Sequence, residues 1–345
     1  MSANRDQDTR TFDRPGSPPV TVVVPTRDRR ASLSRCLEAL REQRYPDVEI
    51  IVVDDASSDE TSRWLQSFAA SNPRMKLRWL RNERRLGANA SRNRAIREAR
   101  GDYIAFLDSD CVAAPDWLEQ LMAGFTHDRI AAVTGRVDSP PPSNIYELTL
   151  KGTSRVHGAG AAPRLVAGNM CIRRNLLIEH PLDEDLQYGC DEEGIFLRLR
   201  AAGYEQRLAP DAVVHHEHGH DRRSFFRQAF IGGAAAAWLV YKYHLPPRLD
   251  LLPFILAYAS LPLVLVDDRL IAAPLVLFGC ALAALAYNER FRKRKSVAEM
   301  VRCFPTLLLY YHVRLAGYLT ESLRLRLTRH GIRRVRLRRT GSAAR

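Results

Sequence analysis

Short apolar segments alternate with amphipathic stretches along residues 20–137 of the chain. The apolar segments are rich in β-branched and aromatic residues, as strands are: Val20–Val24, Glu49–Val53, Lys76–Leu80 and Tyr103–Leu107. The stretches between them repeat apolar residues at helical spacing: Arg30–Gln43, Ser57–Ala70 and Ala88–Ala99. Ser57 is followed three residues later by Glu60, which is the capping-box pattern of a helix start. The alternation predicts an α/β fold with a mostly parallel sheet that helices cover on both faces.

Residues 138–245 follow a less regular pattern. They open with a proline-rich loop at 139–143 and a Gly/Ala-rich stretch at 152–163. A strand-like segment, a helical segment and a second strand-like segment come next: Leu165–Ile172, Asp191–Ala202 and Ala212–His216. We interpret 20–137 and 138–245 as two halves of one α/β unit.

Residues 246–323 form a hydrophobic region. Leu251–Val266 and Leu270–Tyr287 are apolar runs separated by two aspartates and an arginine at 267–269. Their lengths are at or just below the roughly 17–25 residues that span a bilayer. Basic residues flank both outer ends: Lys242, Arg248, Arg290, Arg292, Lys293, Arg294 and Lys295. A membrane-associated helical hairpin with both ends in the cytoplasm fits this pattern, and two helices packed on the rest of the protein or on a second subunit are the alternative.

The charge balance favours an anionic partner. Lys and Arg number 52 against 39 Asp and Glu, for a net charge of +13. The arginine-rich tail at 324–345 either docks on anionic lipid or is solvated. Residues 1–19 are polar and end in prolines, so we expect a disordered lead-in and no signal peptide. The six cysteines form no CxxC pair, which excludes a disulfide-stapled module and a cysteine zinc site and fits a reducing cytoplasm.

Acidic residues follow the predicted strands. In an open α/β sheet, ligands bind outside the carboxyl ends of the strands. The residues there include Thr26, Asp55, Asp108 and Asp110. Because neighbouring carboxylates repel one another, Asp108 and Asp110 together point to a divalent cation that also binds phosphates. A solvated turn or helix cap is the alternative interpretation of these acids.

Two phosphate-binding loops are absent from the sequence. No GxGxxG motif follows the first strand, and no GxxxxGK[ST] motif occurs in the chain. These absences remove the main support for a dinucleotide oxidoreductase and for a P-loop NTPase. A nucleotide held at the strand ends, with its diphosphate bridged by a metal ion, is the arrangement that remains.

Several segments, taken in order, resemble the family 2 glycosyltransferases over roughly residues 20–235. They are Val22–Thr26, Val52–Thr61, Gly87–Asn93, Gly101–Tyr103, Leu107–Asp110, Gly168–Met170, Arg173–Arg174, Asp183–Glu184, Tyr188–Glu193 and Arg198–Tyr204. The resemblance implies the GT-A fold. It implies that 20–137 binds a nucleotide sugar and that 138–245 binds the acceptor and carries the catalytic base.

The resemblance also implies roles for single residues. It assigns contacts with the nucleotide sugar to residues of the first half: Pro25, Thr26, Asp55, Arg84, Arg92 and Asp108. Asp55 would accept a hydrogen bond from the base, and Arg84 or Arg92 would reach the diphosphate. Mn²⁺ or Mg²⁺ would be held by Asp108, Asp110 and His216, with His218 as the second choice of histidine. Asn169 would face the acceptor or the donor sugar.

An inverting transfer needs a base that deprotonates the acceptor hydroxyl. Members of the family with this mechanism commonly use the Asp of a Glu-Asp pair, and here Asp191 and Glu192 occupy the matching positions in reversed order. Either acid is therefore a candidate catalytic residue. Because acids at a helix start also stabilise its dipole, one of the two has a capping role as its alternative.

The resemblance implies a non-processive enzyme, because residues 227–232 lack the Gln-x-x-Arg-Trp motif of the processive synthases. We expect a glycosyltransferase that moves a sugar from a UDP- or GDP-sugar to a glycan or lipid-linked acceptor at the cytoplasmic face of the membrane. Two alternatives remain. One is another nucleotide-sugar transferase, although residues 26–29 lack the Gly-rich loop that a nucleotidyltransferase would need. The other is a non-catalytic membrane scaffold that retains the GT-A fold. Nucleic acid is not expected as a partner, because the basic residues concentrate near the apolar C-terminal runs.

Overall fold

The computed structural model describes residues 18–151, 167–186, 192–216, 219–246, 252–264 and 271–327. An eight-stranded sheet has the order β3-β2-β1-β4-β7-β6-β8-β5. Its strands are β1 (Val20–Thr26), β2 (Val48–Asp54), β3 (Leu77–Arg81), β4 (Tyr103–Leu107), β5 (Cys111–Ala113), β6 (Ile130–Asp138), β7 (Asn169–Arg173) and β8 (Glu205–His216). The first four strands in that order are parallel, β7 is antiparallel to both its neighbours, and β5 is antiparallel to β8. One sheet thus runs through both predicted halves.

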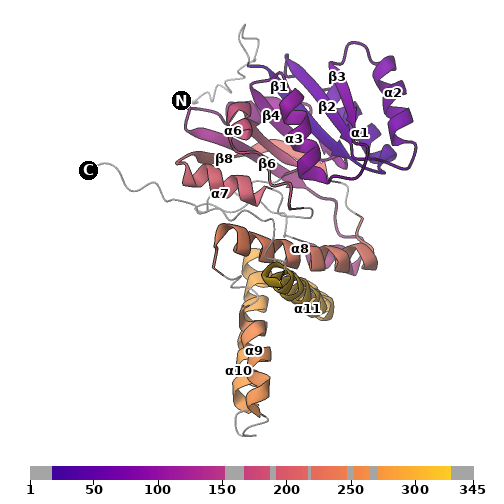
Figure 1. Cartoon of the computed structure of the whole chain (residues 1–345). Coiled ribbons are helices and arrows are strands. Elements are labelled where there is room, and N and C mark those ends of the chain that lie inside the picture. Colours follow the sequence, from indigo (N-terminus) through magenta and orange to yellow (C-terminus); the bar gives the residue numbers. More distant parts are fainter. Residues whose placement is uncertain are drawn as a thin grey trace, which may run out of the picture.

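Helices cover both faces of the sheet (Figure 1). They are α1 (Arg30–Arg41), α2 (Thr61–Ser71), α3 (Ala88–Glu98), α4 (Trp117–Ala123), α6 (Arg174–Glu179) and α7 (Glu193–Ala201). The short helix α5 (Ile145–Leu150) packs instead against the C-terminal helices. Successive strand side chains point to opposite faces. Val22 of β1 therefore packs in a core with Leu37 of α1, while its neighbour Val23 packs in a second core with Ile96 of α3. Burial on both faces explains why β1 is almost continuously apolar.

All four strands predicted in residues 20–137 are confirmed, with identical bounds for Tyr103–Leu107, whereas β5 and β6 were not predicted. The capping box at Ser57 was wrong, because α2 begins four residues later at Thr61. The Ser57 hydroxyl instead accepts a hydrogen bond from the Asp28 amide, and the Ser57 amide donates to Asp54 Oδ1. Ser57 therefore shapes the loop after β2.

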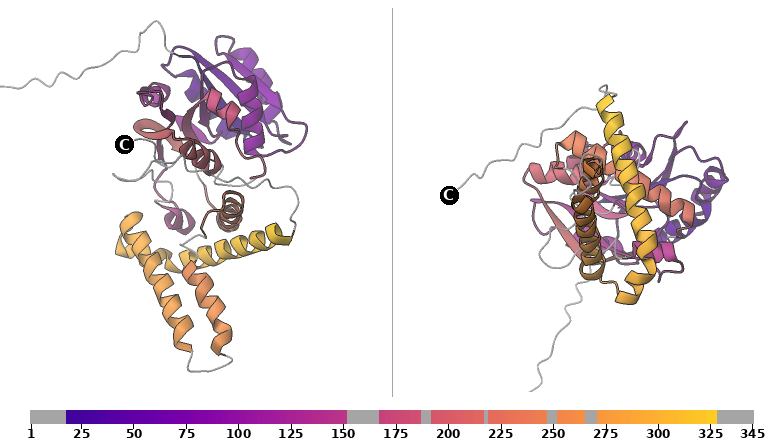
Figure 2. Two further views of the ribbon diagram at one scale, coloured as in Figure 1. Left: turned by 60° about the vertical axis from the view of Figure 1, so that its left-hand side comes forward. Right: turned by 90° about the horizontal axis from the view of Figure 1, so that it is seen from below.

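The sheet and the helices α1–α7 together are called the sheet domain. The C-terminal helices form a separate layer below the sheet domain (Figures 1 and 2). They are α8 (Arg222–Tyr243), α9 (Leu252–Val264), α10 (Ala272–Tyr287), the π-helix η2 (Asn288–Arg292) and α11 (Val297–Leu327). The α8 and α11 backbones cross at Gly233 and Gly317, where a Cβ would overlap a carbonyl of the other helix. The α9 and α10 helices project from this layer as an antiparallel hairpin.

The two apolar runs of the sequence correspond to α9 and α10. Among the described residues, one helix, Ala272–Phe291, is long and apolar enough to cross a membrane. Lys295, one of the predicted flanking cations, is instead fully buried. Its Nζ lies 2.6 Å from Glu289 Oε2 and donates to the Thr149 carbonyl at 2.7 Å. This contact joins the end of the hairpin to α5 of the sheet domain.

Candidate active site

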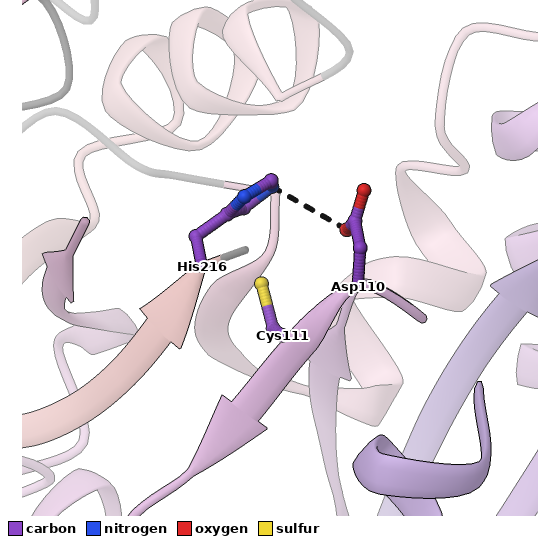
Figure 3. A group of neighbouring side chains, drawn as sticks. All are labelled: Asp110, Cys111 and His216. Atoms are coloured by element: carbon purple, nitrogen blue, oxygen red, sulfur yellow. Dashed lines mark ion pairs between the residues drawn. The ribbon is translucent and has the colours of Figure 1, made fainter. Parts of the chain in front are cut away.

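Asp110, Cys111 and His216 meet where β5 pairs with the end of β8 (Figure 3). The antiparallel register sets Cys111 opposite His216. His216 Nε2 lies 3.4 Å from Asp110 Oδ1, and the three potential ligand atoms all lie within 4.8 Å of one another. The fold therefore brings together two residues that the sequence assigned to a metal site and adds a thiol that the sequence did not indicate.

The donor atoms of Asp110 and His216 fit a divalent ion. Asp110 Oδ1 is buried and has no hydrogen-bond partner among the described residues. Carboxylate oxygen and imidazole nitrogen are suitable ligands for Mn²⁺, and the oxygen suits Mg²⁺ as well. The Cys111 thiol suits these ions less well, because Mg²⁺ and Mn²⁺ prefer oxygen ligands and thiolate sulfur is a soft ligand. Of the three side chains, Asp110 and His216 are therefore the better candidates to hold such an ion.

Arg29 contacts the same carboxylate. Its guanidinium Nη1 donates to Asp110 Oδ2 and forms an ion pair with it. A cation of the protein thus partly neutralises Asp110. Sequence reasoning assigned no role to Arg29, although the residue stands just after the first strand, on the edge of the sheet where the acids gather.

The loop that carries Arg29 is tied to the loop after β2. Asp28 adopts a left-handed backbone conformation with φ of 50°. Its Oδ1 accepts hydrogen bonds from the Ser58 amide at 2.7 Å and from the Asp59 amide at 3.3 Å. Hydrogen bonding, chiefly from the Ser58 amide, lowers the pKa of Asp28. The carboxyl ends of β1 and β2 are therefore held together on the side where Arg29 projects.

Asp108 is held from behind by Arg92. The Arg92 guanidinium is buried, and it donates from Nη2 to Asp108 Oδ1 at 2.8 Å and from Nη1 to Asn89 Oδ1 at 3.1 Å. Gly168 packs against the other carboxylate oxygen, where a Cβ would come within 2.8 Å of Oδ2. The structure therefore places Arg92 as a support for Asp108, whereas the sequence assigned it to the diphosphate.

Asp55 organises the loop between β3 and α3. Its carboxylate accepts hydrogen bonds from Asn82 Nδ2 and the Leu86 amide at 2.8 Å, and from the Gly87 amide at 2.9 Å. Gly87 has a φ of +96°, which favours glycine. Arg84 is exposed in this loop. Asp55 thus fixes the backbone that presents Arg84.

Pro25 and Thr26 end β1 beside this loop. Pro25 is half-buried, and Thr26 is buried in register with Asp54 of β2. The Thr26 hydroxyl has no hydrogen-bond partner among the described residues. A hydroxyl of this kind can bind a polar group of a ligand, because a buried polar atom without a partner is costly.

Asn169 lies in the core. Its Nδ2 donates to the Arg136 and Ala212 carbonyls, both at 2.9 Å, and its Oδ1 accepts from Trp117 Nε1 at 2.8 Å. The side chain is completely buried, so both amide hydrogens are already used. We had expected Asn169 to face a sugar, and the structure instead places it as the polar link between β7, β8 and α4.

Of the two candidate bases, Asp191 lies outside the described residues. Glu192 is half-buried at the N-cap of α7, and its carbonyl accepts from the Phe196 amide at 3.0 Å. Its position at the start of α7 matches the helix-capping alternative as well as the catalytic one.

A buried ionic cluster that the sequence did not indicate lies next to the start of α7. Asp183 accepts hydrogen bonds from Lys242 Nζ at 2.6 Å and from the Tyr243 hydroxyl at 2.5 Å. A Cβ at Gly194 would overlap the Asp183 carboxylate. Burial is the main cause that raises the pKa of Tyr243. The cluster therefore joins the end of α8 to the start of α7. The contact with α7 is at Gly194, two residues after the candidate base Glu192.

An α/β sheet whose strand ends bring carboxylates and a histidine together is typical of the GT-A class. The chain carries a family 2 glycosyltransferase domain, because residues 21–174 match the family model described as glycosyl transferase family 2. The pre-mycofactocin glycosyltransferase of Mycobacterium tuberculosis H37Rv is 30% identical over 315 residues, covering 86% of this chain and 62% of that protein.

A second curated relative and a solved structure are similar to parts of the chain. The GalNAc(5)-diNAcBac-PP-undecaprenol beta-1,3-glucosyltransferase of Campylobacter jejuni is 32% identical over 114 residues, covering 32% of this chain and 37% of that protein. The chain thus spans less than two thirds of the length of either relative. The mannosyltransferase PcManGT of Pyrobaculum calidifontis, solved with GDP-Man and Mn²⁺, aligns with a TM-score of 0.60 at 21% identity and covers 88% of both chains. This likeness supports the GT-A fold.

Proposed function

We propose that this protein is a metal-dependent, inverting and non-processive glycosyltransferase that moves a sugar from a UDP- or GDP-sugar to a hydroxyl group. The observation that carries the proposal is the convergence of Asp110 and His216, which come from distant parts of the chain: His216 Nε2 lies 3.4 Å from a buried carboxylate oxygen of Asp110 that has no hydrogen-bond partner among the described residues. The firmly held Asp108 beside them adds to it. A scaffold that does not bind a nucleotide would gain nothing from these acids.

We propose the following residue roles from the family resemblance. Asp110 and His216 would hold Mn²⁺ or Mg²⁺, which would supply positive charge for the leaving diphosphate. Thr26 and Asp55 bind the nucleoside beside Pro25, Asp108 binds the ribose or the ion, and Arg84 reaches the diphosphate. Arg92 keeps Asp108 in place.

The sugar transfer itself needs one proton acceptor. Asp191 or Glu192 takes the proton of the acceptor hydroxyl as its oxygen bonds to the anomeric carbon, and the bond from that carbon to the diphosphate breaks. A single displacement of this kind inverts the configuration and needs no nucleophile from the protein. The cluster of Asp183, Lys242 and Tyr243 steadies the helix that presents the base.

We also propose that the acceptor is a glycan or a lipid-linked molecule at the cytoplasmic face of a membrane. Two observations support this: the hairpin of α9 and α10 exposes apolar side chains, and α8 begins six residues after His216, so the site is close to the helical layer. The name of the Campylobacter relative includes an undecaprenol-linked acceptor, which agrees with this choice. Anionic lipid, and not nucleic acid, is the partner proposed for the basic surface.

Calorimetric titration of UDP and of GDP into the full chain, with and without Mn²⁺, tests the donor site. We expect one nucleotide to bind in a Mn²⁺-dependent manner, and Asp110→Asn to abolish that dependence. Asp211→Asn is the matched control, because Asp211 is exposed on β8 away from the site. If neither nucleotide binds to the folded protein, the transferase proposal is wrong and the scaffold alternative gains support.

A further inference from the structure

One face of α11 is apolar and exposed. Six of its side chains have exposed fractions between 50% and 74%: Val297, Val301, Leu309, Leu319, Leu323 and Leu327. With 3.6 residues per turn, these positions fall within an arc of about 120° around the helix. A face of this width is typical of an amphipathic helix that packs against an apolar partner.

The catalytic domain is not that partner. The opposite face of α11 is buried through Cys303, Leu307, Tyr318 and Leu325, and it crosses α8 at Gly317. The exposed face is therefore turned away from α8 and the sheet domain. Figure 2 shows α11 lying across the base of the hairpin, on the side from which α9 and α10 project.

The base of the hairpin has the composition of a membrane interface. Tyr287 and Phe291 are exposed there, and their ring centroids lie 4.9 Å apart. Exposed arginines, Arg290 and Arg294, stand next to them. Aromatic side chains gather at the headgroup level of a bilayer, and cationic residues near its surface bind anionic lipids.

We infer that α11 lies in the plane of the membrane interface, with its exposed apolar face among the headgroups and upper acyl chains of an anionic bilayer. The inference rests on the proposed membrane location and adds to it. Exposed apolar side chains occur on both α10 and α11, and the exposed Arg290 and Arg294 stand between the two helices in the chain. A second protein chain would explain the apolar face of α11 but not its place beside a helix that is long and apolar enough to cross a membrane.

The length of the hairpin supports the same arrangement. The 16 residues of α10, Ala272–Tyr287, rise about 24 Å at 1.5 Å per residue, whereas the hydrocarbon core of a bilayer is about 30 Å thick. A layer of water between α11 and the lipid would raise α10 further out of the hydrocarbon core. Direct contact between α11 and the headgroups lets the hairpin reach deepest into the bilayer.

This position of α11 bears on the acceptor. The α8 and α5 helices separate α11 from the sheet, and a helix is about 10–12 Å in diameter. The metal-binding residues then stand about one helix layer above the headgroups. The acceptor hydroxyl of a lipid-linked molecule would lie just outside the headgroups, at this distance from the membrane. A soluble glycan would not require the site to be so close to the membrane.

Depth-dependent quenching of tryptophan fluorescence tests the inference. The full chain is reconstituted in vesicles of phosphatidylcholine and phosphatidylglycerol whose acyl chains carry bromine at a shallow or at a deep position. Leu319→Trp and Leu323→Trp probe α11, and Leu275→Trp probes the exposed side of α10. Ile178→Trp is the control, because Ile178 is equally exposed on α6 of the sheet domain. The unsubstituted protein gives the baseline of the four native tryptophans.

We expect the fluorescence of the tryptophans introduced at 319 and 323 to be quenched more strongly by shallow than by deep bromine. The fluorescence of the tryptophan introduced at 275 should be quenched by deep bromine. The emission added at 178 should be unaffected. Loss at 275 with none at 319 and 323 would overturn the position of α11 and leave the membrane location intact. No loss at 275, 319 or 323 would overturn the membrane location, and the position of α11 with it.

Discussion

Apolar side chains are buried in the sheet domain and exposed in the C-terminal helices. Val22, Val23 and Val24 of β1 are completely buried, whereas Leu275 of α10 and Val301 of α11 are 65% and 71% exposed. The sheet domain removes its apolar surface from water by packing its own elements. Among the described residues, the C-terminal helices instead leave apolar side chains exposed, and exposed apolar surface of this kind commonly marks an interaction site. The two regions therefore differ in how much of their apolar surface the described residues cover.

Buried charges join the two regions. Glu289 lies between Lys293 and Lys295, with Nζ atoms 2.6 Å from its two carboxylate oxygens. Asp183 and Lys242 form a second buried pair where α8 meets the loop before α7. Each pair is costly to desolvate, and each becomes much more costly if one partner is removed.

Disrupting the buried cluster of Glu289, Lys293 and Lys295, the first joint between the two regions, should have the largest effect on stability. Lys295→Met leaves the buried Glu289 with one cation instead of two, and we expect a loss of about 3–5 kcal/mol in the free energy of unfolding. Denaturant unfolding of the full chain in detergent measures it. Lys76→Met is the control, because the pair of Lys76 with Asp47 is exposed, and such pairs contribute about 0–1 kcal/mol. Equal losses in the two variants would contradict a structural role for the joint.

A substitution in the site should separate the functions of the two regions. We expect His216→Ala to lower the rate of sugar transfer by about 100-fold, because loss of a proposed metal ligand weakens binding of the ion. This factor corresponds to about 2.7 kcal/mol in the activation barrier. Binding to vesicles should be unchanged, since His216 lies on β8 and not on the exposed helices. His127→Ala, at an exposed position of the sheet domain, is the control for activity. A parallel loss of vesicle binding would show that the two regions are not independent.

The interior of the sheet domain should be sensitive at Asn169. Asn169→Ala leaves the buried Trp117 Nε1 and two carbonyl groups without partners, and an unsatisfied buried polar group costs about 1–3 kcal/mol. We expect the free energy of unfolding to fall by about 2 kcal/mol, measured by thermal unfolding. Gln66→Ala, at an exposed position of α2, should change it by no more than about 0.5 kcal/mol. If Asn169→Ala instead abolished transfer without any loss of stability, a direct contact with a sugar would be restored as its role.

Asn169 also illustrates which parts of the site the sequence could predict. Strands such as Tyr103–Leu107 are recognisable because burial on both faces leaves a continuous apolar run between turn residues. The pairing of Asp110 with His216 was predicted only through the family resemblance, since no local pattern connects residues so far apart. The roles of Asn169 and Arg92 were not predictable, because a sequence does not indicate whether a polar side chain points into the site or supports it from behind. Lys295 resembled a solvated flanking cation until its contact with Glu289 was known.

The smallest effect is expected at Arg29, and it concerns the metal itself. The exposed guanidinium of Arg29 pairs with Oδ2 of Asp110, the carboxylate whose Oδ1 we propose for Mn²⁺, so its positive charge opposes binding of the ion. An exposed ion pair of this kind contributes about 1 kcal/mol at most. Arg29→Ala should therefore tighten Mn²⁺ binding in the absence of nucleotide by about 2–5-fold, as measured by calorimetry, whereas Arg29→Lys should bind Mn²⁺ like the unsubstituted protein. Weaker Mn²⁺ binding by Arg29→Ala would mean that Arg29 orients Asp110 for the ion and does not compete with it. In that case Arg29 would stabilise the metal-bound site, just as Lys293 and Lys295 stabilise the buried carboxylate of Glu289.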